Sequence, residues 1–145
     1  MIVLDVNVLV SALHAGAADH DAMRTYLEAV VNGSEPVAVS DAVLVGAVRV
    51  LTHPRVFDPP ATPAQAVASV SALIDHPRVR VLPTTPRQWL LTAELVTAAQ
   101  AKGNLVADAG HAAHAISHGA TLVSKDRDFA RFPGLSWRVP ETTAR

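Results

Sequence analysis

The chain has 145 residues and no cysteine, enough for one domain with a substantial hydrophobic core. The lack of cysteine excludes a disulfide framework, a zinc–thiolate site and a cysteine nucleophile. The 12 basic and 13 acidic residues nearly balance, which leaves a nucleic acid partner possible because a local basic rim can attract phosphates.

The chain is apolar for its size, with 50% hydrophobic residues and a mean hydropathy of +0.25. This surplus indicates that another chain covers part of the surface. No apolar run approaches the roughly 20 residues that a membrane-spanning helix needs. Since no basic-plus-apolar leader precedes the first predicted strand either, we expect a cytoplasmic protein without a membrane segment.

Predicted strands alternate with predicted helices from one end of the chain to the other. The first strand is the apolar run before Asp5, and Ser40 and Thr62 are expected N-caps of later helices. The predicted strands are 1–4, 37–39, 79–82, 121–124 and 135–139; the predicted helices are 6–13, 20–32, 41–51, 63–75, 86–101 and 108–118, with a helical turn at 129–132. This alternation predicts one α/β/α domain over residues 1–140, with a central parallel sheet of four to five strands and a flexible tail at 141–145.

Four aspartates stand at predicted strand ends or helix starts: Asp5, Asp41, Asp108 and Asp126. Asp5 and Asp126 follow apolar runs, whereas Asp41 and Asp108 open predicted helices. Such positions lie on one edge of a parallel sheet, so the four carboxylates can converge. Each one alone has a structural explanation, as a residue at a helix start for Asp5, Asp41 and Asp108 and as a turn residue for Asp126, but the joint pattern favours a shared site.

Converged carboxylates repel one another, so either some stay protonated or a divalent cation neutralises them. Mg²⁺ prefers oxygen ligands and keeps several waters when it binds near a phosphate substrate. The sequence contains no HExxH motif, which points away from a zinc protease. The pattern is typical of metal-assisted phosphoryl chemistry.

Four segments in a fixed order carry a resemblance to a known family. They are DVNVL at 5–9, SDAVLVGAVRVLTHPRVF at 40–57, NLVADA at 104–109 and TLVSKDRDFARFPGLSW at 121–137. Together these segments resemble the PIN-domain ribonucleases and, more narrowly, the VapC toxins of bacterial toxin–antitoxin pairs. The resemblance covers nearly the whole chain.

The resemblance implies an endoribonuclease that uses Mg²⁺ or Mn²⁺ and acts as the toxin of a toxin–antitoxin pair. Asp5, Asp108 and Asp126 would bind the metal, with Asn7 and Ser124 in support. Asp128 is expected to support or cap rather than to bind the metal. The implied partners are an RNA substrate, a VapB-type antitoxin that blocks the metal site, and a second copy in a homodimer.

Asp41, the fourth predicted catalytic acid, is where the chain departs from the family pattern. The VapC branch that it resembles usually has a glutamate after the serine, and most PIN proteins have the acid near Gly46. Aspartate is one methylene shorter, so we expect it to reach a metal only through water. The alternative function is therefore a catalytically weak or inactive PIN module that only binds RNA or antitoxin.

Basic residues near the ends of elements are candidates for contacts with RNA phosphates. The main ones are Lys125, Arg127 and Arg49, followed by Arg55, Lys102 and Arg131. Three histidines and the two tryptophans are given structural rather than catalytic roles. His111, His114 and His118 share a helical face and are expected at the surface or at a dimer interface rather than as zinc ligands, and Trp89 and Trp137 in the core or at an interface.

Two other enzyme classes fit less well. A haloacid-dehalogenase-type phosphatase also has an aspartate after its first strand, but it needs a second one two positions later, where this chain has Asn7. A Toprim-type nuclease could use Asp126 and Asp128, but no strand-end glutamate precedes them.

Overall fold

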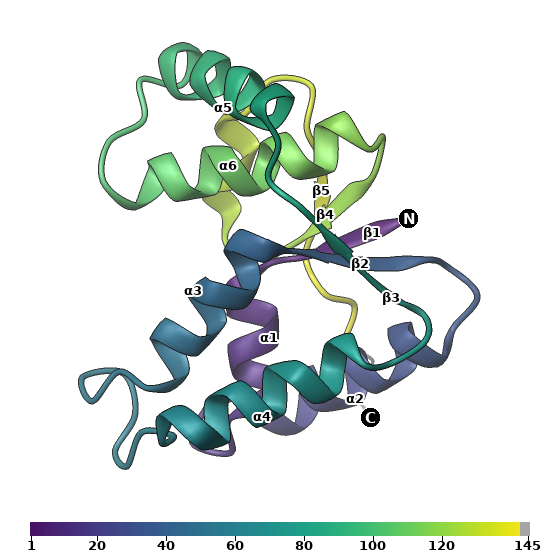
Figure 1. Cartoon of the computed structure of the whole chain (residues 1–145), viewed down its shortest axis with the longest axis vertical. Helices are drawn as coiled ribbons and strands as arrows, with labels where there is room; N and C mark the ends of the chain where they lie inside the picture. Colours follow the sequence, from purple (N-terminus) through teal and green to yellow (C-terminus); the bar gives the residue numbers. More distant parts are fainter. Residues whose placement is uncertain (143–145) are drawn as a thin grey trace.

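The computed structural model describes residues 1–142; part of the predicted tail, residues 143–145, lies outside the described residues. Five parallel strands form one sheet in the order β3-β2-β1-β4-β5 (Figure 1). The elements in chain order are β1 (Ile2–Leu4), α1 (Val6–Leu13), α2 (His20–Asn32), β2 (Val37–Ser40), α3 (Asp41–Leu51), α4 (Pro63–Ile74), β3 (Val79–Leu82), α5 (Pro86–Ala98), α6 (Asn104–Ser117), β4 (Thr121–Val123), the 3₁₀ helix η1 (Arg127–Arg131) and β5 (Ser136–Arg138).

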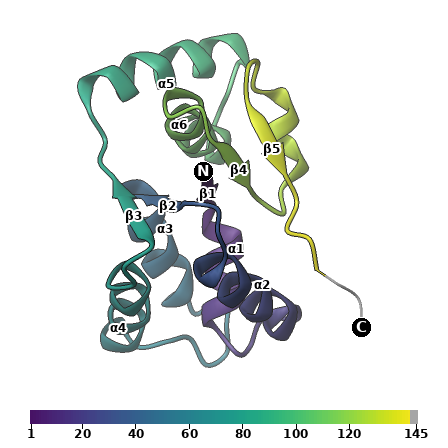
Figure 2. The same cartoon turned by 90° about the vertical axis from the view of Figure 1, so that its right-hand side faces the viewer.

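Helices cover both faces of the sheet, as predicted. Helices α1 to α4 lie on one face, and α5 and α6 lie on the other (Figures 1 and 2). The strands alternate between the two cores because successive side chains point to opposite faces. In β1, Ile2 and Leu4 pack into the core beneath α1–α4, while Val3 packs into the core beneath α5 and α6. The predicted three-layer fold is confirmed.

Several element boundaries differ from the prediction, and one of them changes the site. Helix α6 begins at Asn104 rather than at 108, so Asp108 lies in its second turn instead of at its N-terminus. Helix α5 ends at Ala98 rather than at 101, because Gln100 adopts a positive φ of 49°. At the other elements, β2 includes Ser40, α4 ends at Ile74, β4 ends at Val123, η1 begins at Arg127, and β5 is confined to Ser136–Arg138.

The predicted places of the histidines and tryptophans are partly wrong. His111 and His114 are only 7% and 2% exposed, so they lie inside the monomer rather than at its surface. Trp89 is 64% exposed and therefore lies outside the core, whereas Trp137 packs partly buried against the core beneath α5 and α6. Within residues 1–142, none of the helices combines the length and the apolar character needed to cross a membrane.

Candidate active site

Asp5 stands where β1 ends and α1 begins. Its backbone N–H donates to the carbonyl of Val123 at 3.0 Å, which joins the end of β1 to β4. Its Oδ1 caps α1 by accepting a hydrogen bond from the N–H of Val6 at 2.7 Å. The residue is 4% exposed. The carboxylate is thus held at the carboxyl end of the central strand.

Ser124, the first residue after β4, connects the predicted supporting groups. Its buried hydroxyl donates to Oδ2 of Asp5 at 2.7 Å and accepts from the side-chain amide of Asn7 at 2.9 Å and from the N–H of Asp126 at 3.0 Å. The Asn7 side chain also accepts from the N–H of Lys125 at 3.1 Å. Ser124 and Asn7 therefore fix the ends of β1 and β4 relative to each other.

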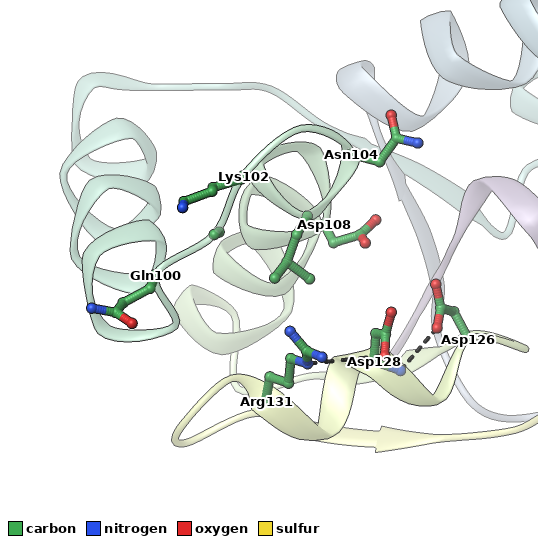
Figure 3. Close-up of a pocket in the computed structure, with 9 residues that line it drawn as sticks. Gln100, Lys102, Asn104, Asp108, Asp126, Asp128 and Arg131 are labelled. Carbon is green, nitrogen blue, oxygen red and sulfur yellow. Dashed lines mark hydrogen bonds and ion pairs between the residues drawn. The ribbon is translucent and has the colours of Figure 1, made fainter.

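An open pocket of about 770 Å³ adjoins this network at Asp126, which lines it. Figure 3 shows Asp108 extending from α6 toward Asp126, with Asp128 beside it. Asp126 begins η1, and its Oδ1 accepts from the N–H of Asp128 at 2.8 Å. The pocket is lined by Gln100, Ala101, Lys102, Asn104, Leu105, Asp108, Asp126, Asp128 and Arg131.

The carboxylates around this pocket act on one another electrostatically. Burial and, in addition, the charges of Asp5, Asp126 and Asp128 together raise the pKa of Asp108 to about 6. Three of the four predicted catalytic acids, together with the supporting Asp128, therefore contribute to one negative field. The fold brings them together from β1, α6 and the segment after β4.

The donor chemistry of this site suits a hard divalent cation, since it consists of carboxylate oxygens with unbalanced negative charge. Within residues 1–142, no three acidic or histidine side chains are close enough together to hold a metal ion as they stand. Asp5 is fixed by its hydrogen bonds, whereas Asp108 and Asp126 line the open pocket. A cation shared by Asp5, Asp108 and Asp126 would therefore need these carboxylates closer together than they stand.

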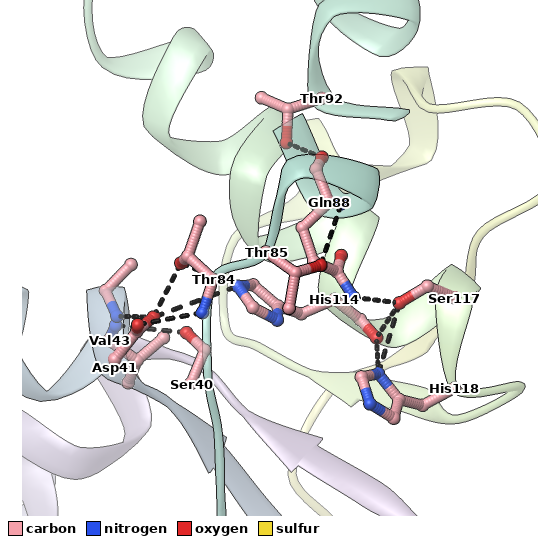
Figure 4. A network of polar contacts seen from close by, with 11 residues as sticks. Ser40, Asp41, Val43, Thr84, Thr85, Gln88, Thr92, His114, Ser117 and His118 are labelled. Atoms are coloured by element: carbon pink, nitrogen blue, oxygen red, sulfur yellow. Dashed lines mark hydrogen bonds and ion pairs between the residues drawn. The ribbon is translucent and has the colours of Figure 1, made fainter. Parts of the chain in front are cut away.

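Asp41 is not brought into the acidic pocket. Its carboxylate accepts hydrogen bonds from the N–H of Thr84 at 2.8 Å, from the Thr84 hydroxyl at 2.7 Å and from the N–H of Ala42 at 2.8 Å (Figure 4). His114 lies 4.0 Å away. Burial opposes ionisation, but the hydrogen bonds from Thr84 and Ala42, with the charge of His114, outweigh it, so the pKa of Asp41 is below its ordinary value. Asp41 thus joins the start of α3 to the β3–α5 loop.

The candidate RNA-binding cations fall into different environments. Lys125 donates to Ser11 at 2.6 Å and to Asp19 at 2.8 Å, so its charge stabilises the α1–α2 connection. Lys102 and Arg131 line the acidic pocket. Arg127 and Arg49 are exposed and lie outside that lining.

Sequence reasoning missed Thr84, which binds Asp41, and Gln100 and Asn104, which line the acidic pocket. The Asp41–Thr84 contact joins residues 43 positions apart and leaves no local pattern in the sequence. A loop between two helices that ends four residues before a predicted acid would have been the available signal for Asn104.

Comparisons with known proteins place the chain in a family. The PIN domain family model matches residues 2–135. Ribonuclease VapC43 from Mycobacterium tuberculosis is 42% identical over 140 residues, covering 97% of this chain and 95% of the relative. Ribonuclease VapC31 from the same species is 37% identical over 135 residues, covering 93% and 95%.

A solved structure shows the same fold. VapBC2 from Rickettsia felis, bound to a DNA fragment from its promoter, superposes with a TM-score of 0.72 at 23% identity, covering 97% of this chain and 100% of the solved one. Together with the family match and the identity to the mycobacterial relatives, this agreement confirms the resemblance inferred from the sequence. The chain belongs to the PIN-domain family and, within it, to the VapC ribonucleases.

Proposed function

We propose that this protein is a divalent-metal-dependent endoribonuclease that acts as the toxin of a toxin–antitoxin pair. Asp5, Asp108 and Asp126 would hold Mg²⁺ or Mn²⁺. The observation that carries this proposal is that Asp108 and Asp126 line one pocket, and that Ser124 links Asp126 to Asp5. The raised pKa of Asp108 supports it, because a cation would neutralise the negative charge gathered there. The ribonuclease names of the relatives support the same reaction class.

When bound, the cation would activate a water for attack on the phosphodiester and offset negative charge on the phosphate. The residues of the chain prepare the site for that chemistry. Ser124 and the N–H of Val6 fix the two oxygens of Asp5, and the N–H of Asp128 orients Asp126. Lys102 and Arg131, at the rim of the pocket, would attract the RNA backbone.

The partners follow from the family. Solved relatives are described as VapBC assemblies, which supports a VapB-type antitoxin for this chain. Large apolar side chains on the surface, such as Val45 and Leu90 at 72% and 64% exposure, support further protein contacts, including the homodimer. A cytoplasmic location, where RNA and antitoxin would be met, stays a prediction.

The test is RNA cleavage by the purified protein with Mg²⁺ or Mn²⁺, compared with the same protein in a chelator. We expect Asp5→Asn and Asp108→Asn each to abolish divalent-dependent cleavage, and Asp21→Asn, the same change at an exposed position of α2, to leave it intact. Cleavage retained in both active-site variants would overturn the assignment.

The alternative, an inactive module that only binds RNA or antitoxin, is favoured by the position of Asp41 away from the acidic pocket. Metal titration separates the two readings. A protein that binds the cation gains melting temperature as Mn²⁺ is added, and Asp5→Asn should lose that gain. A binding module without a metal site would show no gain in either form.

A further inference from the structure

The set of acids around Asp5 is incomplete on the side of α3. The fourth predicted acid, Asp41, is bound by Thr84 and is not part of the acidic pocket. Further along α3, Gly46 lies so close to Val6, the residue after Asp5, that a Cβ atom at position 46 would be 2.9 Å from Cγ2 of Val6. Helix α3 therefore comes next to the Asp5 segment at a residue that carries no side-chain donor.

His111 on α6 adjoins the same place. It lines a pocket together with Gly46, Val6 and Ala107, the residue before Asp108. The side chain is only 7% exposed, and its Nδ1 atom has no hydrogen-bond partner within residues 1–142. Because buried polar atoms are normally paired, a buried ring nitrogen without a partner at this place is available to a ligand.

His111 is also close to two of the acids proposed to bind the metal. It follows Asp108 by three residues on α6, and residues at this spacing are neighbours on a helix surface, with Cβ atoms about 5–6 Å apart. Burial lowers the pKa of His111, and the charge of Asp5 opposes that shift, so this charge acts on the ring. The lowered pKa keeps the imidazole neutral at pH 7, and the neutral ring is the form that binds metals.

His114, three residues later on α6, has a different environment although it is also buried, at 2% exposure. Its Nε2 atom lies 3.4 Å from the hydroxyl of Thr84 and 4.0 Å from Oδ1 of Asp41 (Figure 4). Its Nδ1 atom, like that of His111, lacks a hydrogen-bond partner in the described part of the chain. The two histidines therefore differ in which carboxylates they adjoin, and this difference makes His114 a matched control for His111.

We propose that His111 supplies a nitrogen ligand to the divalent cation of this site, beside Asp5 and Asp108, at the place where α3 offers only Gly46. The inference rests on the proposed metal-dependent ribonuclease function and adds to it a ligand and a preference among metals. Imidazole suits transition-metal ions, whereas Mg²⁺ prefers oxygen donors and keeps several waters. The chain should therefore bind ions such as Mn²⁺ and Co²⁺ partly through His111, and Mg²⁺ through its carboxylates.

The test is electron paramagnetic resonance of Mn²⁺ bound to the untagged protein, recorded as electron spin-echo envelope modulation. A directly bound imidazole nitrogen modulates the Mn²⁺ echo, whereas carboxylate and water oxygens do not. We expect nitrogen modulation in the parent, its loss in His111→Leu and its retention in His114→Leu. Labelling the histidine rings with nitrogen-15 should change the modulation pattern of the parent, which assigns the signal to histidine without any variant.

Metal affinities measured by calorimetry give a second readout. His111→Leu should weaken Co²⁺ binding at least roughly 10-fold, the smallest loss usual even for a group that only orients a metal ligand, and should leave Mg²⁺ binding nearly unchanged. His114→Leu should leave the affinities for both ions unchanged. Circular dichroism checks that each variant is folded. If His111→Leu does not fold, His111→Gln replaces it, because glutamine keeps the position polar and has no ring nitrogen.

The outcomes distinguish this proposal from the proposed function. If the parent binds Mn²⁺ in a way that Asp5→Asn abolishes, but without nitrogen modulation, the metal site stands and His111 is not a ligand. Nitrogen modulation that persists in His111→Leu, or that His114→Leu removes, also overturns the proposal. If the parent binds no divalent cation, both proposals fail.

Discussion

The hydroxyl of Ser124 donates a hydrogen bond of 2.7 Å to Oδ2 of Asp5, so the residue after β4 orients a carboxylate that β1 supplies. The same hydroxyl accepts from Asn7 and from the N–H of Asp126. One buried oxygen therefore joins the end of β1 and the start of α1 to the segment after β4, two of the regions that supply the candidate site. This arrangement makes Ser124 a positioning residue for Asp5 and Asp126.

Ser124→Ala should reduce divalent-dependent RNA cleavage by roughly 10- to 100-fold, the usual effect of losing a group that orients a metal ligand. It should also destabilise the fold by about 1–3 kcal/mol, because Asn7 and Asp126 lose their acceptor. Single-turnover cleavage and urea unfolding measure the two effects. Ser136→Ala is the control, since within residues 1–142 its exposed hydroxyl forms its one hydrogen bond with Thr121. Full activity in Ser124→Ala would contradict the positioning role.

Asp108→Asn should stabilise the metal-free protein at neutral pH while it abolishes cleavage. The pKa of Asp108 is about 6 in the fold against an ordinary 3.8, so the folded state binds its proton more tightly than the unfolded state. The free energy of unfolding of the parent therefore falls as pH rises from 3.8 to about 6. Asparagine stays uncharged at every pH. At neutral pH, Asp108→Asn should therefore raise the free energy of unfolding by about 1 kcal/mol, after allowance for solvent screening.

Thermal melts in a chelator at pH 4 and pH 7.5 measure this effect. The two proteins should melt alike at the lower pH, and Asp108→Asn should melt higher at the upper pH. Mn²⁺ should then stabilise the parent and not the variant. A difference in melting temperature that does not change with pH would show that burial and the neighbouring charges do not disfavour the ionised form of Asp108.

Part of this site could be predicted from the sequence, since Asp5 and Asp126 each follow an uninterrupted apolar run and parallel strands end at one edge. The start of α6 could not be predicted. It follows Gly103, whose φ is 58°, and no side chain caps it. The earlier start moves Asp108 into the second turn, where burial raises its pKa.

The exposure of residues on an alanine-rich helix is similarly hard to predict from local pattern. His111 and His114 lie inside because tertiary packing turns that side of α6 inward, and polar residues at helical spacing give no sign of this choice. The placement of Asp41 depends on Thr84, 43 residues away in sequence, so no short motif could indicate it. The burial of the two histidines and the placement of Asp41 both depend on contacts between segments far apart in the sequence.

Asp41→Ala should affect stability more than cleavage. It removes the acceptor for the N–H and hydroxyl of Thr84 and for the N–H of Ala42, and we expect a loss of about 1–2 kcal/mol. Thr84→Val, which removes the hydroxyl alone, should lose less. Urea unfolding and RNA cleavage at saturating Mn²⁺ measure both. If Asp41→Ala folds normally but is as inactive as Asp5→Asn, Asp41 is catalytic, as the sequence predicted.

Arg131 and Lys125 should differ in how much each contributes to the salt dependence of RNA binding. Arg131 lines the acidic pocket, where its Nε lies 3.9 Å from Oδ1 of the exposed Asp128, whereas Nζ of Lys125 is held at 2.8 Å by Asp19 and at 2.6 Å by Ser11. On the Asp5→Asn background, Arg131→Gln should reduce the slope of log affinity against log salt by about 0.7, the contribution of one phosphate contact to a single strand. Lys125→Met should leave the slope unchanged and destabilise the protein by about 0.5–1 kcal/mol. Equal slopes for Arg131→Gln and the parent would exclude a phosphate contact at Arg131.

The absence of an acid near Gly46 has a packing cause that can be tested. A Cβ atom at position 46 would lie 2.9 Å from Cγ2 of Val6, closer than real Cβ contacts allow. Gly46→Ala should therefore destabilise the protein despite the better helix propensity of alanine, because Val6 must shift. In the Val6→Ala background the clash disappears, and the same change should stabilise α3 by up to about 1 kcal/mol. A double-mutant cycle by urea unfolding measures the coupling. Additive effects would show that Val6 does not determine which residue position 46 accepts.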